Sequence, residues 1–417
     1  MKSNYKRLGP YIQQVDIRNK DDKRDNLLGV SVSKNFIESI ANTVGTNFKR
    51  YKVVKKGQFT YIPDTSRRGD KIAIALLEDK EQGLVSQAYT VFEVIDTDSL
   101  LPEYLMMWFR RPEFDRYARF ISHGSVREIF SWEDMCDVEL PIPSIQEQRK
   151  IVEEYNVIKN RIRLNNQFIK ELEEISQTIY KQWFVNFEFP NDDGNPYKSN
   201  GGALEFNEEL DMEIPKGWKV VPLKSICTKI GSGSTPRGGK DSYHNEGISL
   251  IRSQNVYDFA FSPEDIAYID ENQAQRLKNV EVKEHDILLN ITGVSVARCC
   301  IVPKFILPAR VNQHVMIILP DSNYYINHYL LCLLCYSDNK SKLLGISQSG
   351  STREAITKSE VEDFKIILPT NKVLKSFDEH LWNIIQLIEN KILQNEKLRS
   401  FSKLFLSKLA TEKEVVQ

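Results

Sequence analysis

Residues 124–143, GSVREIFSWEDMCDVELPIP, are matched 226 positions later by residues 350–369, GSTREAITKSEVEDFKIILP. Both stretches begin with Gly-Ser-x-Arg-Glu and reach a proline after the same number of residues. The same offset places Gln87, in Val-Ser-Gln, on Gln313, in Val-Asn-Gln. A match kept without gaps over this distance indicates that the chain consists of two copies of one unit.

Length and charge narrow the class of protein. The chain has 417 residues, with 56 Lys and Arg against 57 Asp and Glu and a formal net charge of −1. At roughly 100–200 residues per domain, this length predicts two to four domains. Near-neutral charge argues against a non-specific nucleic-acid coat, whose affinity depends on excess Lys and Arg. It leaves room for a reader of sequence that concentrates a few cations locally.

Membrane and metal signals are weak. No apolar run approaches the roughly 18–20 residues of a membrane span, and the N-terminal segment lacks the apolar core of a signal peptide, so we expect a cytoplasmic protein. The six cysteines are scattered and lack zinc spacing, which predicts reduced, buried thiols and no metal site.

A long helical pattern follows each copy. From Ser144, with Glu147 three residues on as in a capping box, there is no Pro or Gly until after Phe184. Seam residues then recur at alternating spacings of three and four, as in a coiled coil. The rows are Ile151, Ile158, Asn165, Leu172 and Ile179 with Tyr155, Ile162, Ile169, Ser176 and Trp183, and in the second copy Phe377, Ile384, Lys391, Leu398 and Phe405 with Leu381, Ile388, Asn395, Ser402 and Leu409.

Each stripe is also what an amphipathic helix on its own domain would show. The two helical segments have equal length and their apolar stripes have the same heptad phase, which favours packing of the two helices on each other as an antiparallel pair. Helices of roughly 40 residues would form a spacer about 60 Å long.

Both globular parts have a mixed α and β pattern, so the predicted fold class is α+β with a pseudo-twofold internal repeat. In the first copy we expect strands at 71–77 and 88–94 and a helix at 102–109. In the second copy we expect strands at 286–292, 297–302 and 314–319 and a helix at 327–336. The shared order is strand, strand, helix, Gly-Ser-x-Arg loop and long helix.

The loop Gly231–Lys240, GSGSTPRGGK, has two readings. A P-loop would need Gly and then Ser or Thr where the chain has Ser234 and Asp241, so nucleotide hydrolysis is not predicted. Hydroxyls and cations in such a loop suit DNA phosphates, and they equally suit a solvated surface loop. The candidates are Ser232, Ser234, Thr235, Arg237 and Lys240.

Other polar side chains have the chemistry to read base edges, because Arg pairs with guanine, and Asn or Gln with adenine, in the major groove. In the second copy these are Arg252, Ser253, Gln254, Asn255 and Gln313, and in the first copy Arg67, Arg68, Lys71 and Gln87. Any one of them alone is more typical of an ordinary surface residue. Arg127 and Arg353, in the paired Gly-Ser-x-Arg-Glu segments, either clamp the DNA backbone or form a structural salt bridge or helix cap.

Catalytic patterns are missing from the sequence. We find no Asn/Asp-Pro-Pro-Tyr/Phe run of an amino-methyltransferase, no G-x-G-x-x-G after a strand and no H-E-x-x-H. This favours a non-catalytic binding subunit without a cofactor. A nuclease with an unrecognised site is the enzyme alternative.

The plan of the chain resembles the DNA-specificity (S) subunits of type I restriction–modification enzymes. The resemblance covers essentially the whole chain and is carried by GSGSTPR (231–237), GISLIRSQN (247–255), EIPKGW (213–218), WFVNFE (183–188) and IPSIQEQR (142–149). It implies two target-recognition domains, each reading half of a bipartite double-stranded DNA site. Paired helices would set the gap and dock two methyltransferase subunits, with motor-nuclease subunits added for cleavage and no membrane partner.

Carried over to this chain, the resemblance implies five segments: recognition domain 1–143, spacer helix 144–188, linker 189–213, recognition domain 214–369 and spacer helix 370–417. The first domain lacks the Gly-Trp and GSGSTP opening of the second, so its DNA contacts are less well indicated. The alternative function is a non-catalytic adaptor that bridges two enzyme subunits without reading sequence.

Overall fold

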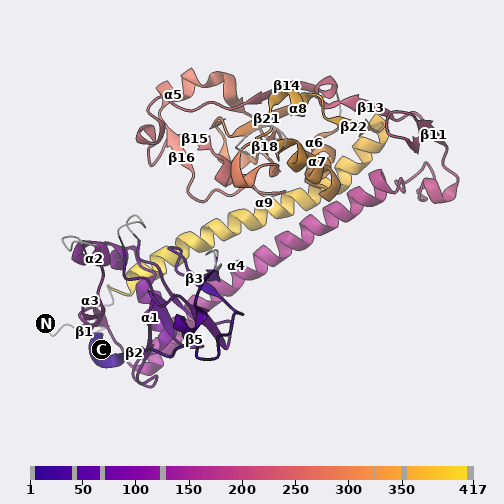
Figure 1. The fold of residues 1–417 in the computed structure, drawn as a ribbon. Helices are drawn as coiled ribbons and strands as arrows, with labels where there is room; N and C mark the ends of the chain where they lie inside the picture. The colour runs from indigo at the N-terminus through magenta and orange to yellow at the C-terminus, as the bar shows by residue number, and fades with distance from the viewer. Residues whose placement is uncertain are drawn as a thin grey trace. The chain divides into compact units, whose positions relative to one another are not determined.

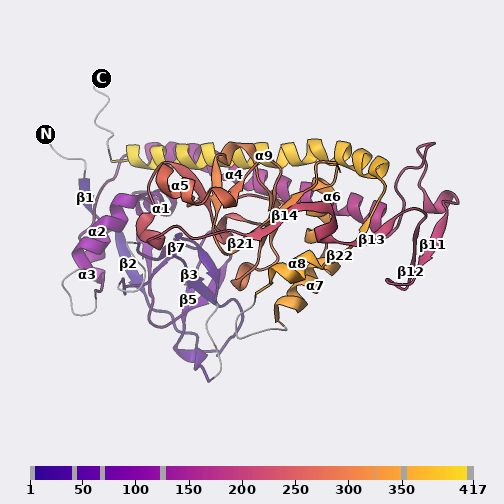
Figure 2. The ribbon, with the colours of Figure 1, turned by 90° about the horizontal axis from the view of Figure 1, so that it is seen from above.

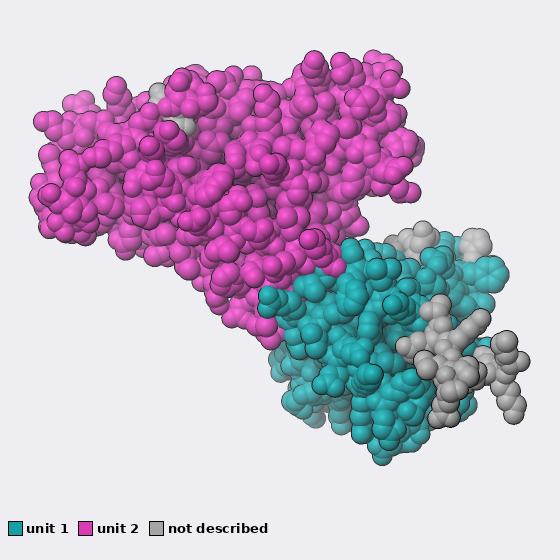
Figure 3. Space-filling view, turned by 180° about the vertical axis from the view of Figure 1, so that it is seen from behind, with its two compact units in different colours: residues 1–161, 398–417 teal, residues 162–397 magenta. Residues whose placement is uncertain are grey.

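The computed structural model describes residues 5–39, 45–65, 71–122, 128–323, 325–348 and 355–410. It divides into two compact units, residues 1–161 with 398–417 and residues 162–397 (Figure 3). The boundary passes through both long helices, so each unit holds one globular domain together with a part of each helix. None of the helices in the described ranges is long and apolar enough to cross a membrane.

Unit 1 is built on a four-stranded antiparallel sheet (Figure 1). Its order is β2 (Ile12–Val15), β9 (Thr90–Val94), β6 (Phe59–Tyr61) and β7 (Ile74–Leu76). Helix α1 (Pro102–Phe109) covers this sheet, and its Phe109 ring meets the stacked rings of Phe59 and Phe92 edge-on. Burial of these aromatic side chains supplies much of the core, because each removes 150–250 Å² from water.

Smaller elements complete unit 1. Strands β3 (Leu28–Val30) and β4 (Phe36–Glu38) form one pair, β5 (Lys52–Lys55) and β8 (Gln82–Val85) a second, and β1 (Tyr5–Arg7) and β10 (Glu139–Pro141) a third. A parallel bridge between Leu27 and Leu84 joins the first two pairs, giving the spatial order β4-β3-β8-β5. Helices α2 (Pro112–Ser122) and α3 (Trp132–Cys136) follow α1.

Unit 2 repeats this topology. Its main sheet has the order β14 (Cys227–Ser232), β21 (Val315–Pro320), β18 (Ile287–Asn290) and β19 (Cys299–Ile301). A second sheet has the order β16 (Ala267–Ile269), β15 (Ile248–Ile251), β20 (Ala309–Val311) and β17 (Glu281–Val282), the counterpart of β4-β3-β8-β5. Helix α5 (Glu271–Arg276) lies between β16 and β17.

The strand pair β13 (Lys219–Pro222) and β22 (Lys365–Leu368) in unit 2 corresponds to β1 and β10. Helices α6 (Asn327–Cys335), α7 (Ser337–Gln348) and α8 (Lys358–Glu362) match α1, α2 and α3. The hairpin β11 (Leu204–Asn207) and β12 (Met212–Pro215) comes from the segment between the copies and has no counterpart in unit 1 among the described residues.

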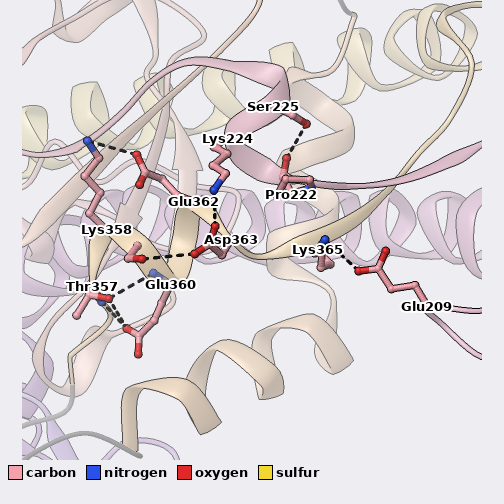
Figure 4. A network of polar contacts seen from close by, with 11 residues as sticks. Glu209, Pro222, Lys224, Ser225, Thr357, Lys358, Glu360, Glu362, Asp363 and Lys365 are labelled. Atoms are coloured by element: carbon pink, nitrogen blue, oxygen red, sulfur yellow. Dashed lines mark hydrogen bonds and ion pairs between the residues drawn. The ribbon is translucent and has the colours of Figure 1, made fainter.

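Local capping repeats as well. Helix α3 starts with a capping box between Ser131 and Asp134, and α8 starts with one between Thr357 and Glu360, 226 positions later. Figure 4 shows the second box beside the ion pair Lys224–Asp363, whose Nζ–Oδ1 distance is 2.7 Å. That ion pair links the short turn after β13 to the end of α8. The internal repeat predicted from the sequence is therefore confirmed at the level of strand order, helix position and helix caps.

The long helices are α4 (Ile145–Tyr180), which continues as a π-helical turn at Lys181–Val185, and α9 (Asn371–Lys408). Ser144 caps α4 as predicted, because its Oγ accepts a 3.3 Å hydrogen bond from the Glu147 amide. A continuous run of helix-compatible residues between the cap and the turn explains the length of α4.

In each unit, the α4 segment lies beside the α9 segment (Figure 1 and Figure 2). In unit 1 the rings of Tyr155 and Phe405 are 6.1 Å apart. In unit 2, Asn165 Nδ2 donates to Asn395 Oδ1 over 2.9 Å, and Trp183 packs on Phe377. Later residues of α4 meet earlier residues of α9, so the pairing is antiparallel, as predicted.

One predicted seam row of α9 is displaced by one residue. Phe377 is buried, but Ile385 and Ile392 are then buried in place of Ile384 and Lys391, which are only partly covered. An α-helix has 3.6 residues per turn and drifts against a strict 3.5-residue repeat, so the buried row moves along the helix. In the other row, Leu381, Ile388, Asn395 and Leu409 are buried as predicted, whereas Ser402 is only partly covered.

Candidate nucleic-acid interface

The strand order of unit 2 brings four loops to one edge. Strands β14 and β18 both run antiparallel to β21, so both end where β21 begins. Strand β15 runs parallel to β20, so both end beside the turn that leads into β21. We call residues 232–240, 252–255, 291–298 and 312–314, which comprise the last residue of β14 and the segments that follow these strands, the loop edge of unit 2.

Backbone hydrogen bonds join these segments. The Gly233 amide donates to the Val315 carbonyl and the Asn312 amide to the Ile251 carbonyl, over 2.9 and 3.0 Å. A Cβ atom at Gly233 would lie 2.2 Å from the Asn312 carbonyl oxygen, so only glycine fits this close approach. The loop edge is therefore a defined surface rather than a set of independent loops.

Most residues predicted for DNA contact in the second copy lie on this surface. Exposed side chains are Ser232, Thr235, Arg237, Lys240, Gln254 and Gln313, and half-buried ones are Ser234, Arg252 and Ser253. The structure thus groups three loops that are separated in the sequence. Each exposed side chain offers a hydrogen-bond donor, an acceptor or a positive charge to a ligand.

Asn255 requires a correction. Its side chain is fully buried, and its Nδ2 donates to the carbonyls of Ser262 and Glu264 over 2.9 and 3.1 Å. Its Oδ1 accepts from the Arg252 amide over 3.1 Å. Because the amide group is bonded within the domain, Asn255 positions the loop and does not present a base-reading group.

Arg252 is also engaged internally. Its Nη2 donates to the Asp265 carbonyl, and its guanidinium lies 5.5 Å from the centre of the Tyr243 ring. Its Nε is buried without a hydrogen-bond partner. Arg252 therefore supports the surface in this conformation, while the neighbouring Gln254 is the exposed member of the motif.

Sequence reasoning missed the 291–298 loop and its contacts. Thr292 Oγ1 lies 2.7 Å from His314 Nδ1, and Gln313 Nε2 lies 3.0 Å from His314 Nε2. Asn290, fully buried, donates from Nδ2 to the Ser253 carbonyl over 2.8 Å. In the sequence, the position of His314 next to Gln313 is the one sign of this cluster. Only the strand order shows that Asn290 and Thr292 lie beside them.

Unit 1 carries an equivalent edge, formed by the segments after β2, β3 and β6, the turn between β8 and β9, and the turn before β5. We call residues 16–26, 31–35, 47–51, 62–65, 71–73 and 86–89 the loop edge of unit 1. Lys71 and Gln87 are exposed there. Gln87 and Gln313 both occupy the turn that precedes the second strand of the main sheet, as their offset predicted.

The charged segment 16–25, DIRNKDDKRD, was also missed as part of this surface. Asn19 is buried and holds it, donating from Nδ2 to the carbonyls of Lys23 and Phe48 over 2.8 and 3.1 Å. The segment lines one side of a hollow of about 570 Å³, whose other side comes from β5 and β8. Exposed cations on or beside it are Lys20, Lys23, Arg24, Lys49 and Arg50.

Lys52, at the start of β5, is a partly buried cation beside this edge. Lys52 Nζ donates to the Tyr89 carbonyl over 2.8 Å, and burial lowers the pKa of Lys52. Lys52 thus joins β5 to the turn that carries Gln87. The remaining predicted residues, Arg67, Arg68, Arg127 and Arg353, lie outside the described residues. Within the described ranges, no group of three metal-ligating side chains is present.

These features define a class of protein: a duplicated α+β domain on paired antiparallel helices, with a polar loop edge on each copy. The chain belongs to the type I restriction modification DNA specificity domain family, whose model matches residues 4–174 and 215–404. Both matched segments contain one domain and a part of its following helix. The expected resemblance is confirmed, and the chain is a DNA-specificity subunit of the type I restriction–modification class.

Individual proteins similar to this chain include two specificity subunits and one solved structure. The MjaIX specificity subunit of Methanocaldococcus jannaschii is 29 % identical over 310 residues, which span 73 % of this chain and 66 % of that protein. The HindI specificity subunit of Haemophilus influenzae is 22 % identical over 408 residues, with 86 % of each chain covered. The solved S subunit of the type I system from M. genitalium is 13 % identical, covers 98 % of this chain and 96 % of its own, and has a TM-score of 0.49.

Proposed function

We propose that this chain reads a bipartite double-stranded DNA site, one half-site with each loop edge. The observation that carries the proposal is that equivalent strands build a polar loop edge in both units. Sequence reading needs donors and acceptors aimed at base edges, and positioning needs contacts to phosphates. Both kinds of group occur on each edge.

The residues divide by chemistry. Gln254 and Gln313 in unit 2, and Gln87 in unit 1, have the exposed amides that pair with adenine. Hydroxyl groups and cations would position the backbone: Ser232, Ser234, Thr235, Arg237, Lys240, Ser253 and Arg353 for the second copy, with Arg67, Arg68, Lys71 and Arg127 for the first. Arg252 and Asn255 would act by holding the second loop in place.

We propose the division 1–143, 144–188, 189–213, 214–369 and 370–417 for recognition domain, spacer, linker, recognition domain and spacer. In this scheme α4 and α9 set the gap between half-sites. Asn165 and Asn395, buried and bonded to each other, would fix the register of the pair at a cost in stability. A fixed register is what a ruler needs.

Methylation and cleavage would be carried out by partners in the cytoplasm: two methyltransferase subunits and added motor-nuclease subunits. Apolar side chains on the outer faces of the helices offer a docking surface. In unit 2, Leu164, Phe168 and Ile175 of α4 and Leu387 of α9 are 39–49 % exposed. Burial of these side chains against a methyltransferase subunit would stabilise the complex.

Selection from random duplexes tests the proposal. The chain, purified with its methyltransferase partner, should enrich one sequence made of two fixed parts and a fixed gap. An adaptor that does not read sequence would bind without enrichment. The chain alone, incubated with Mg²⁺ and DNA, should leave the DNA intact, whereas an unrecognised nuclease would cut it.

A further inference from the structure

The loop after β18 presents an isolated apolar side chain on the unit 2 loop edge. Val294 is 101 % exposed, and no other large hydrophobic side chain in the described ranges is more exposed. Its loop contacts the loop of Gln254 through Asn290 and Ser253, and the turn of Gln313 through Thr292 and His314. Val294 therefore lies on a loop that is bonded to both segments that carry the proposed readers Gln254 and Gln313.

Val294 is exposed on an ordered loop. Backbone hydrogen bonds join the two ends of the loop. The Asn290 amide donates to the Arg298 carbonyl, and the Asn290 carbonyl accepts from the Ala297 amide, both over 2.8 Å. Asn290 Nδ2 also donates to Ser295 Oγ over 3.2 Å. Gly293 has a φ of 73°, and its carbonyl accepts from the Val296 amide over 2.9 Å, which closes a turn around Val294. The backbone thus holds the isopropyl group outward.

An isopropyl group cannot bind a phosphate or a hydrogen-bonding base edge. The major groove offers one apolar feature, the 5-methyl group of thymine, and aliphatic side chains read it by contact. We propose that Val294 is a specificity-determining residue that contacts a thymine methyl group in the second half-site. This inference rests on the proposed function of the unit 2 loop edge and adds one base preference to it.

The test is a double-mutant cycle between protein and DNA. The half-site recognised by unit 2 is first identified by selection, and each of its thymines is then replaced in turn by uracil, which lacks the methyl group. Binding of the wild-type complex should weaken about fourfold at one position, the effect of one buried methyl group. Val294→Ala should weaken binding to the thymine duplex and lose the difference between thymine and uracil at that position.

A matched control is Ile95→Ala. Ile95 is 54 % exposed and follows β9 in unit 1, at the end of the strand away from its loop edge. Ile95→Ala should retain the full thymine-to-uracil difference. Neither Val294 nor Ile95 is buried in a hydrophobic core, so the melting temperatures of both variants should equal that of the wild-type chain.

Three results would overturn the inference. The second half-site could contain no thymine, or the Val294→Ala complex could keep the uracil effect at every position. Alternatively, Val294→Ala could weaken binding to the thymine and uracil duplexes equally, as expected if Val294 were a wedge between base pairs. Failure of the underlying function would look different. In that case the wild-type complex itself would show no preference for any selected duplex.

Discussion

Replacement of Asn165 by alanine tests the helix pair at its centre. The side chains of Asn165 and Asn395 are each 2 % exposed, and Asn165 Nδ2 donates to Asn395 Oδ1 over 2.9 Å. Asn165→Ala leaves that buried acceptor without its donor, which costs about 1–3 kcal/mol. Asn395→Ala should cost as much or more, because Asn395 also donates to Asn166 Oδ1 over 2.8 Å.

The double variant Asn165→Ala with Asn395→Ala should cost less than the two single changes added together, with a coupling energy of about 1–2 kcal/mol. Urea unfolding followed by far-UV circular dichroism measures each free energy. Gln167→Ala, an exposed change on the same helix, is the matched control and should change stability by less than about 0.5 kcal/mol. Additive single effects would refute the pairing of these side chains.

Three further predictions concern the spacer, the reader loops and pH. Insertion of four residues into both α4 and α9 adds about 6 Å of helix and should lengthen the recognised gap by about two base pairs, as read by duplex selection; an unchanged gap would contradict the ruler. Gln254→Ala should weaken cognate binding and methylation about tenfold while size-exclusion chromatography shows normal partner assembly, and an unchanged sequence preference would remove this loop from the reader. Burial, with Asp258 nearby, raises the pKa of Glu173 to about 7, so the fold favours the protonated form and loses stability as pH rises through 7. Glu173→Gln should therefore raise the free energy of unfolding by about 1 kcal/mol more at pH 8 than at pH 5, after allowance for partial exposure, as measured by urea unfolding at the two pH values. An equal effect at both pH values would contradict this assignment.

Local signals predicted the elements that depend on local chemistry. The helix at Pro102–Phe109 has the predicted bounds, because proline at the first turn and a following apolar run are sufficient to define it. Ser144 marked the start of α4 through its capping chemistry. The repeat carried the assignment of the first-copy helix to residues 327–336 of the second copy, where the structure has α6 (Asn327–Cys335).

The site was harder to predict, because it depends on strand order. Asn255 and Gln254 are adjacent and chemically alike, yet one is fully buried and the other exposed. Only the fold shows that Asn255 bonds to the carbonyls of Ser262 and Glu264. Segment 16–25 was overlooked for the same reason, since its charges cancel in the sequence and its position beside Gln87 follows from the pairing of β5 and β8.

Gln87 and Gln313 allow the most direct test of two independent readers, because they occupy equivalent turns in the two copies. The measurement is a map of methylated sites in cells that express the methyltransferase partner with the wild-type chain, with Gln87→Ala or with Gln313→Ala. Gln87→Ala should relax bases in one half-site only, Gln313→Ala bases in the other half-site only, and the gap should stay constant. Relaxation of the same half-site by both substitutions, or a methylated site without two separate parts, would contradict the account.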